Sequence, residues 1–243
     1  MDTKVSVCMA TYNGQKTITK QLNSILKQLS LEDEMIIVDD CSTDETIKTV
    51  KEITATFKGT VIIEKNAQNM GPIFSFEKAL KKATGDLIFL SDQDDEWLDN
   101  KVELMKNAYL SQHADLIVSD ATVIGKDGSI IDSSWNHYNN NSMNQSVMGN
   151  LMKNGYTGAM MAVSKKLVAL SLPFPPKVEM HDQWLFLVAK KNKLKTFYIK
   201  QPLMNYVRHG GNVTGMSKRR KKDMVVGRFN MLIDYLKLRR TER

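Results

Sequence analysis

The stretch from Leu87 to Trp97, LIFLSDQDDEW, runs from four apolar residues directly into the acids Asp92, Asp94, Asp95 and Glu96. A buried strand that ends in acids places charge at the carboxyl edge of a sheet, where open α/β sheets bind their ligands. Acids this close together repel one another, and hard oxygen ligands of this kind suit Mg²⁺ or Mn²⁺. The same pattern fits a strand followed by a polar helix start, because acids are common in the first turn of a helix. The stretch alone leaves both interpretations open.

The rest of the first 90 residues alternates strand-like and helix-like patterns. Residues 5–9, 35–38, 61–63 and 87–90 are short runs rich in apolar and β-branched residues, and apolar residues recur at helical spacing between them. This βαβαβαβ order predicts an α/β fold, with a mostly parallel central sheet flanked by helices. Polar or acidic residues follow the first, second and fourth of these strands, so we expect them to meet at one edge of the sheet.

The second half of the chain is less regular. Strand character returns at residues 116–118, 157–163 and 197–199, and a hairpin is expected around Gly125–Ser129. The Asn- and Ser-rich segment 132–145 is predicted to be a loop. We therefore divide the chain into a first half at 1–119, a second half at 120–216 and a basic helix at 217–243.

Composition excludes several classes of protein. The 243 residues suffice for one large domain, and 42% hydrophobic and 25% charged residues are ordinary for a globular protein. No apolar run reaches the ~18 residues of a membrane span. The N-terminal residues do not lead into a secretory signal, so we expect a cytoplasmic protein with reduced cysteines at Cys8 and Cys41.

The net charge of +7 lies at the C-terminal end. Residues 217–243 hold ten Lys or Arg and three acids, which leaves 24 basic and 24 acidic residues before them. A neutral body is not a nucleic-acid-binding surface, so only the tail is expected to seek an anionic partner. Val225, Phe229, Leu232 and Leu236 recur there at helical spacing. The tail is thus either a helix on an anionic membrane surface or a helix packed on its own domain.

Three kinds of site fit acids at the end of a parallel strand. A dinucleotide oxidoreductase is disfavoured because no GxGxxG follows the first strand, and no P-loop motif occurs. An aspartyl phosphatase or phosphotransferase also carries Asp-x-Asp after a strand, but a small residue usually follows its nucleophile. Here Asp95 and Glu96 follow instead, and the motif ends the fourth strand, not the first. A sugar-nucleotide enzyme remains.

Several segments resemble, in order, the signatures of family 2 glycosyltransferases of the GT-A fold. They are VSVCMATYN at 5–13, IIVDDCSTD at 36–44, Asn69-x-Gly71 and LSDQDDEW at 90–97. The stretch His181-Asp182-Gln183-Trp184 and the segment Tyr206-x-x-His209-Gly210 resemble the bacterial rhamnosyltransferase-like branch. The resemblance covers about residues 4 to 215. It implies a GT-A type, Rossmann-like sheet and a metal-dependent, inverting transfer of sugar. It also implies that residues 1–119 are the nucleotide-sugar-binding half and residues 120–216 the acceptor-binding half of the same GT-A domain.

The resemblance also implies roles for single residues. Asp40 would read the pyrimidine base and Tyr12 would pack against it, since an aromatic face suits a base. Asp94, with Asp92 directly or through water, would hold Mg²⁺ or Mn²⁺ on the diphosphate, and His209 would close over the diphosphate or the metal. The nucleotide-sugar site so implied comprises Ala10, Thr11, Tyr12, Asp40, Asn69, Gly71, Asp92, Gln93, Asp94 and His209.

Asp182 resembles the general base of the family, which takes the proton of the acceptor hydroxyl. An ordinary helix cap would occupy the same position, and the two roles are compatible. Asp95 is left between a supporting role at the metal, an acceptor-side role and a helix-start acid. His181, where many members of the family carry Glu, has no assigned role.

The expected reaction moves a sugar from a dTDP- or UDP-sugar to a hydroxyl of a glycan or polyprenyl-linked glycan, in bacterial cell-wall, capsule or other surface polysaccharide synthesis. Rhamnose is the candidate sugar by resemblance only. The expected location is cytoplasmic, at the inner face of the cell membrane, and a homodimer stays open. A phosphatase, or a non-catalytic nucleotide-sugar-binding partner, is the alternative.

Overall fold

A computed structural model describes residues 3–208 and 221–238, with side chains from residue 224 in the second range. In the first half the strands and helices are β1 (Val5–Thr11), α1 (Ile18–Leu26), β2 (Glu34–Asp39), α2 (Thr46–Thr54), β3 (Thr60–Lys65), α3 (Pro72–Lys82), β4 (Leu87–Ser91), β5 (Glu96–Trp97) and α4 (Lys101–Gln112). In the second half they are β6 (Leu116–Gly125), β7 (Ile130–Asp132), α5 (Trp135–Tyr138), α6 (Val147–Met152), the 3₁₀ turn η1 (Gly158–Met160), β8 (Met161–Ser164), α7 (Lys165–Ser171), α8 (His181–Lys191), β9 (Thr196–Arg208) and α9 (Lys221–Lys237).

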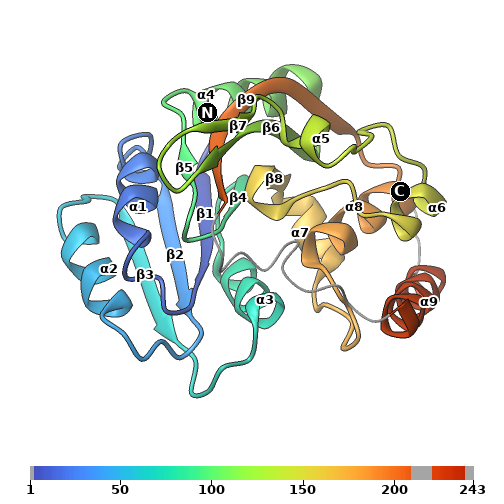
Figure 1. Ribbon diagram of the computed structural model, residues 1–243, viewed down its shortest axis with the longest axis horizontal. Helices are drawn as coiled ribbons and strands as arrows, with labels where there is room; N and C mark the ends of the chain where they lie inside the picture. Colours follow the sequence, from blue (N-terminus) through green and yellow to red (C-terminus); the bar gives the residue numbers. More distant parts are fainter. Residues whose placement is uncertain (1–2, 209–220, 239–243) are drawn as a thin grey trace.

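One mixed sheet runs through the described residues in the order β3-β2-β1-β4-β8-β6-β9-β5, with β7 paired to β6. The strands β3, β2, β1 and β4 are parallel, and β8 runs antiparallel to both β4 and β6. Helices α1 and α2 cover one side of the parallel strands and α3 the other (Figure 1). The α/β fold with a mostly parallel sheet is therefore confirmed.

The parallel strands form because their residues are buried on both faces. Every residue of β2 and β4 is buried, and both strands are rich in Ile, Val, Leu and Phe. Such runs are typical of a parallel sheet covered by helices on both sides. The register pairs Thr11 with Asp39 and Met9 with Ser91, so β1, β2 and β4 end at the same edge.

Two predictions of local structure were wrong. The predicted loop 132–145 contains α5, because Ser134 caps it by accepting a hydrogen bond from the His137 N–H and Trp135 is buried beneath it. The predicted strand 157–163 begins only at Met161, after the turn η1. Helix α2 begins without a side-chain cap, with Glu45 at the N-cap position, and the Ser42 hydroxyl donates to Asp39.

The C-terminal helix α9 lies against α6 and α8 (Figure 1). Met231 is buried there, and the Lys191 ammonium lies 4.9 Å from the centre of the Tyr235 ring. Of the apolar stripe noted in the sequence, Val225, Phe229 and Leu236 remain exposed. The helix thus packs on its own domain and still presents an apolar face outward. Over the two described ranges, no helix combines the length and the apolar character needed to cross a bilayer.

Candidate active site

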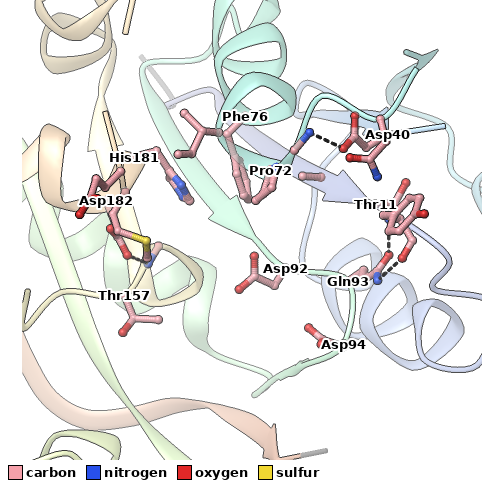
Figure 2. A pocket seen from close by; sticks show the side chains of 18 of the residues that line it. Thr11, Asp40, Pro72, Phe76, Asp92, Gln93, Asp94, Thr157, His181 and Asp182 are labelled. Atoms are coloured by element: carbon pink, nitrogen blue, oxygen red, sulfur yellow. Dashed lines mark hydrogen bonds between the residues drawn. The ribbon is translucent and has the colours of Figure 1, made fainter. Parts of the chain in front are cut away.

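A cavity of about 460 Å³ opens at the shared edge of β1, β2 and β4 and extends to α8. Figure 2 shows the labelled acids around it, with Asp40 at one end, Asp182 at the other and Asp92 between them. Of the predicted site residues, the cavity is lined by Ala10, Thr11, Tyr12, Asp40, Asn69, Gly71, Asp92, Gln93, Asp94 and Asp182. His209, the remaining one, lies outside the described residues.

Asp40 is buried just beyond β2 and held by three donors. Its Oδ1 accepts hydrogen bonds of 2.8 Å from Asn66 Nδ2 and from the Met70 N–H, and its Oδ2 accepts one of 2.7 Å from the Gly71 N–H. An ionised carboxylate offers about four acceptor positions. One position on Oδ2 is therefore left for a donor from a ligand in the cavity.

Gln93, between the two acids of the motif, is engaged with Tyr12. Its Oε1 accepts from the Tyr12 N–H and its Nε2 donates to the Tyr12 carbonyl, each at 2.9 Å. The amide thus fixes the backbone that follows β1 against the loop that follows β4. Tyr12 is 47% exposed and lines the cavity, so its ring can face a ligand at the cavity mouth.

The acids of the motif lie in different surroundings. Asp92 and Asp94 line the cavity, whereas Asp95 is 2% exposed and points into the protein. Burial, together with the charges of Asp94 and Asp182, raises the pKa of Asp92 to about 7. A carboxylate whose pKa is raised by burial and by other acids is one that a cation would stabilise in its charged form.

Asp95 joins the motif to β9. Its Oδ1 accepts a hydrogen bond of 3.2 Å from the Val207 N–H, and its Oδ2 has no partner among the described residues. Burial, followed by the charges of Asp94 and Asp92, raises the pKa of Asp95 well above its usual value. The helix-start interpretation was wrong, because the short strand β5 follows Asp95 and α4 begins at Lys101.

The cavity wall supplies part of the coordination shell of a divalent cation. No group of three or more His, Cys, Asp or Glu side chains in the described ranges is arranged to hold a metal ion. Mg²⁺, however, is commonly held by one or two carboxylates, with phosphate oxygens and water completing the octahedron. Asp92 and Asp94 supply those two carboxylates at the cavity wall, so the donor set fits a cation bound together with a phosphorylated ligand.

Asp182 lies in the first turn of α8, 3% exposed. Its Oδ2 accepts a hydrogen bond of 3.1 Å from the Gly158 N–H, and its Oδ1 accepts one of 2.9 Å from Asn154 Nδ2. Burial raises the pKa of Asp182, while His181 and the hydrogen bonds oppose that shift. Asp182 is not the helix cap, because Met180 occupies that position.

His181 stacks on Phe76 of α3 with ring centroids 4.3 Å apart. Burial lowers the pKa of His181, so the ring is neutral near neutral pH. Its Nε2 is buried without a partner in the described part of the chain, and a Cβ added to Gly158 would lie 2.6 Å from it. The stacking of His181 on Phe76 joins α8 to α3 at the cavity wall.

Sequence reasoning missed several residues that shape this site. Phe76 and the Thr157–Gly158 segment line the cavity, and Asn154 and Lys101 support it from behind. Phe76 looked like one more apolar residue on a helix. Asn154 and Gly158 precede β8 and belong to no apolar periodic pattern in the sequence. Only the fold reveals that both donate hydrogen bonds to Asp182.

The family model described as Glycosyl transferase family 2 matches residues 6–168. This chain belongs to glycosyl transferase family 2. The dTDP-rhamnosyl transferase RfbG of Shigella flexneri is 23% identical over 220 residues, which cover 85% of this chain and 73% of the relative. Several relatives with 29–34% identity match 45–53% of this chain, which spans about half of their own length or less.

Two solved structures share this fold. The structure of Staphylococcus aureus TarS residues 1–349 in complex with UDP-GlcNAc superposes with a TM-score of 0.75 at 20% identity, over 97% of this chain and 67% of that one. The mannosyltransferase PcManGT of Pyrobaculum calidifontis, in complex with GDP-Man and Mn²⁺, gives 0.65 at 18% identity, over 97% and 63%. The GT-A fold predicted for this family 2 member is thus confirmed.

Proposed function

We propose that this protein is an inverting, metal-dependent glycosyltransferase, which moves a sugar from a pyrimidine nucleoside diphosphate sugar to a hydroxyl of a glycan or lipid-linked acceptor. The observation that carries the proposal is the distribution of acids around one cavity. Asp40 lies at one end with a free acceptor position, Asp92 and Asp94 lie in the middle, and Asp182 lies buried at the far wall. This order matches base, diphosphate and reacting sugar laid along the cavity.

At the base end, Asp40 accepts the N3–H of uracil or thymine, and the Tyr12 ring packs on the base. Hydrogen bonds to charged groups contribute roughly 1.5–3 kcal/mol each. Both UDP and dTDP present this N3–H, so sugars of either nucleotide are candidate donors. A relative is named a dTDP-rhamnosyl transferase, which supports dTDP-rhamnose as one candidate donor, and TarS was crystallised with UDP-GlcNAc, which supports UDP-sugars.

In the middle of the cavity, Asp94 and Asp92 would hold Mg²⁺ or Mn²⁺ together with the diphosphate, and His209 would close over them. Bound there, the cation supplies a Lewis acid that neutralises charge on the departing diphosphate. Gln93 serves this region indirectly, since it locks the Tyr12 backbone against the motif. The complex of PcManGT with Mn²⁺ supports the assignment of a divalent cation.

At the far wall, Asp182 takes the proton of the acceptor hydroxyl as the sugar is transferred. A single well-placed base contributes roughly 10²–10⁴-fold to the rate. One base suffices because a nucleoside diphosphate on a cation is already a good leaving group. Attack from the side opposite the diphosphate inverts the anomeric carbon, which is the stereochemical outcome that the resemblance implies.

The acceptor is proposed to be a glycan or polyprenyl-linked glycan of a bacterial surface polysaccharide, bound by residues 120–216. A lipid-linked acceptor gives a purpose to α9, whose exposed Val225, Phe229 and Leu236 lie on a basic segment. Basic residues near an anionic leaflet contribute roughly 1 kcal/mol each. We therefore place the protein at the inner face of the cell membrane, held at its surface by α9.

A panel of nucleotide sugars tests this function. Thermal shift with UDP-, dTDP-, GDP- and ADP-sugars, each with and without Mn²⁺ or Mg²⁺, should show stabilisation by a UDP- or dTDP-sugar that depends on the cation. Stabilisation by no pyrimidine donor would contradict the proposal. Release of phosphate from simple esters without a nucleotide sugar would favour a phosphatase, and cation-dependent binding without transfer to any acceptor would favour a non-catalytic partner.

A further inference from the structure

Lys101, the first residue of α4, is completely buried. Lysine is almost never fully buried unless its ammonium group has partners. Here Nζ donates a hydrogen bond of 2.7 Å to the Ala159 carbonyl, lies 3.3 Å from Met204 Sδ and sits 4.5 Å from the centre of the Trp97 ring. The side chain thus reaches from α4 across the interior to the turn η1.

The turn η1 contacts the acceptor end of the cavity. Ala159, which accepts from Lys101, directly follows Gly158, and the Gly158 N–H donates to Asp182 Oδ2 at 3.1 Å. Gly158 also lies against His181, because a Cβ there would come 2.6 Å from His181 Nε2. The position of this one glycine therefore governs both the Asp182 carboxylate and the ring next to it.

We propose that Lys101 is a positioning residue, which holds the turn η1 through the Ala159 carbonyl and thereby fixes the Asp182 carboxylate at the cavity wall. The chain of contacts is short and entirely buried: ammonium to carbonyl, one peptide unit, then amide to carboxylate. The side chain has the length and the terminal donor that this reach requires, and no aliphatic side chain supplies both. The proposal deepens the proposed function, because it assigns Lys101 to the base of the transfer reaction.

Electrostatics gives Lys101 a second connection to the site. The charges of Asp95 and Asp92 oppose the effect of burial, which lowers the pKa of Lys101 to about 7. Asp92 in turn feels the charge of Asp182. Lys101 thus lies behind the cavity wall, between the acids of the motif and the turn that holds Asp182. Its cation offsets part of the repulsion among these acids.

The variant Lys101→Met, with Lys51→Met on the exposed face of α2 as matched control, tests the proposal. A misplaced base costs kcat but not donor affinity, so kcat should fall by about 10–100-fold while the donor dissociation constant stays within about twofold. In the Asp182→Asn background, Lys101→Met should cause little further loss, because residues that act through one another are not additive. Equal losses in both backgrounds, or an unchanged kcat in the single variant, would overturn the proposal.

A readout without activity separates this proposal from the proposed function. The Gly158 N–H lowers the pKa of Asp182, so a loosened turn should raise it. The groups that face Asp182 are His181 on its own helix and Asp92 across the cavity. Loss of the Lys101 charge raises the pKa of Asp92, which weakens its repulsion of Asp182 and acts against an upward shift, so an upward shift reports the loosened turn. Carboxyl ¹³C NMR titration should show the Asp182 midpoint at higher pH in Lys101→Met than in wild type. An unchanged midpoint would overturn the positioning role even if transfer is confirmed.

The base role of Asp182 and the positioning role of Lys101 can be refuted independently of each other. If Asp182→Asn transfers sugar at the wild-type rate, the base assignment fails, while the NMR titration still reports on Lys101. If Lys101→Met does not fold, Lys101→Gln takes its place, since its neutral amide is one bond shorter and cannot span the distance to Ala159. It is expected to lower kcat and to raise the Asp182 midpoint, and wild-type values for both would overturn the proposal.

Discussion

The Gly71 N–H donates a hydrogen bond of 2.7 Å to Oδ2 of Asp40, and this contact ties the end of β2 to the start of α3. Gly71 has φ of 85°, a backbone conformation that a side chain would strain. A Cβ added to Gly71 would meet no atom within 4 Å, so glycine is needed here for its backbone conformation and not for close packing. The contact orients the carboxylate so that its remaining acceptor position faces the cavity.

Replacing Asp40 by Asn should weaken donor binding without abolishing the fold. The amide keeps the shape but loses the charge, and its NH₂ group would meet the N–H of Gly71 or Met70. A charged hydrogen bond is worth roughly 1.5–3 kcal/mol, so we expect the UDP or dTDP dissociation constant to rise by about 10–100-fold. Isothermal titration measures this, with Glu52→Gln on the exposed face of α2 as control. Equal affinities for Asp40→Asn and wild type would remove Asp40 from the base site.

Gln93 is predicted to act through the backbone. Gln93→Ala removes both hydrogen bonds to Tyr12, each worth about 1 kcal/mol net, and frees the loop that carries the aromatic ring. Donor affinity should fall by about 5–30-fold, with kcat at saturating donor nearly unchanged. Steady-state kinetics at fixed acceptor separates the two parameters. A fall in kcat alone would show that Gln93 contacts the reacting groups instead.

Asp182 should set the acid limb of the pH–rate profile. It must be ionised to accept a proton, and its pKa is raised by burial from the usual 3.8. Transfer should therefore be lost as the pH falls through that raised pKa, at a higher pH than an exposed Asp would give. Asp182→Asn should lower kcat by about 10²–10⁴-fold and abolish this limb in the residual activity. If the Asp182→Asn variant kept the same acid limb in its pH–rate profile, that limb would belong to another titrating group.

The two faces of α9 should behave differently on substitution. Met231 is buried, so Met231→Ala should lower the free energy of unfolding by about 2–5 kcal/mol, as measured by urea denaturation. Phe229 and Leu236 are 60% and 65% exposed, and the double change to Ser should leave stability within about 0.5 kcal/mol. The same double variant should lose co-sedimentation with anionic liposomes. Full retention of liposome binding would contradict the membrane role of this helix.

Much of the cavity could be predicted because its acids directly follow apolar strands. Thr11, Asp39 and Ser91 end three parallel strands in register, and the side chains just beyond them share one edge for that reason alone. A strand followed by a polar residue is visible in any single sequence. The motif around Asp92 and the pocket around Asp40 were accessible in this way.

The far wall was less accessible, because tertiary contacts override local pattern there. Gly158 was predicted to lie in a strand, yet its N–H bonds to Asp182 and its missing side chain makes room for His181. Lys101 follows Asp99 and Asn100, and nothing in that polar run indicates burial. Side chains that act through another element leave no periodic trace, so the fold was needed to find them.

Calorimetric titration of the preferred donor, with and without Mn²⁺, into wild type, Asp94→Ala and Asp182→Asn tests the division of labour in this cavity most directly. We predict that binding to wild type depends on the cation and that Asp94→Ala abolishes this cation-dependent binding. Asp182→Asn should bind the donor as wild type does, although it transfers no sugar. Cation-dependent binding that survives in Asp94→Ala, or donor binding that is lost in Asp182→Asn, would contradict the account.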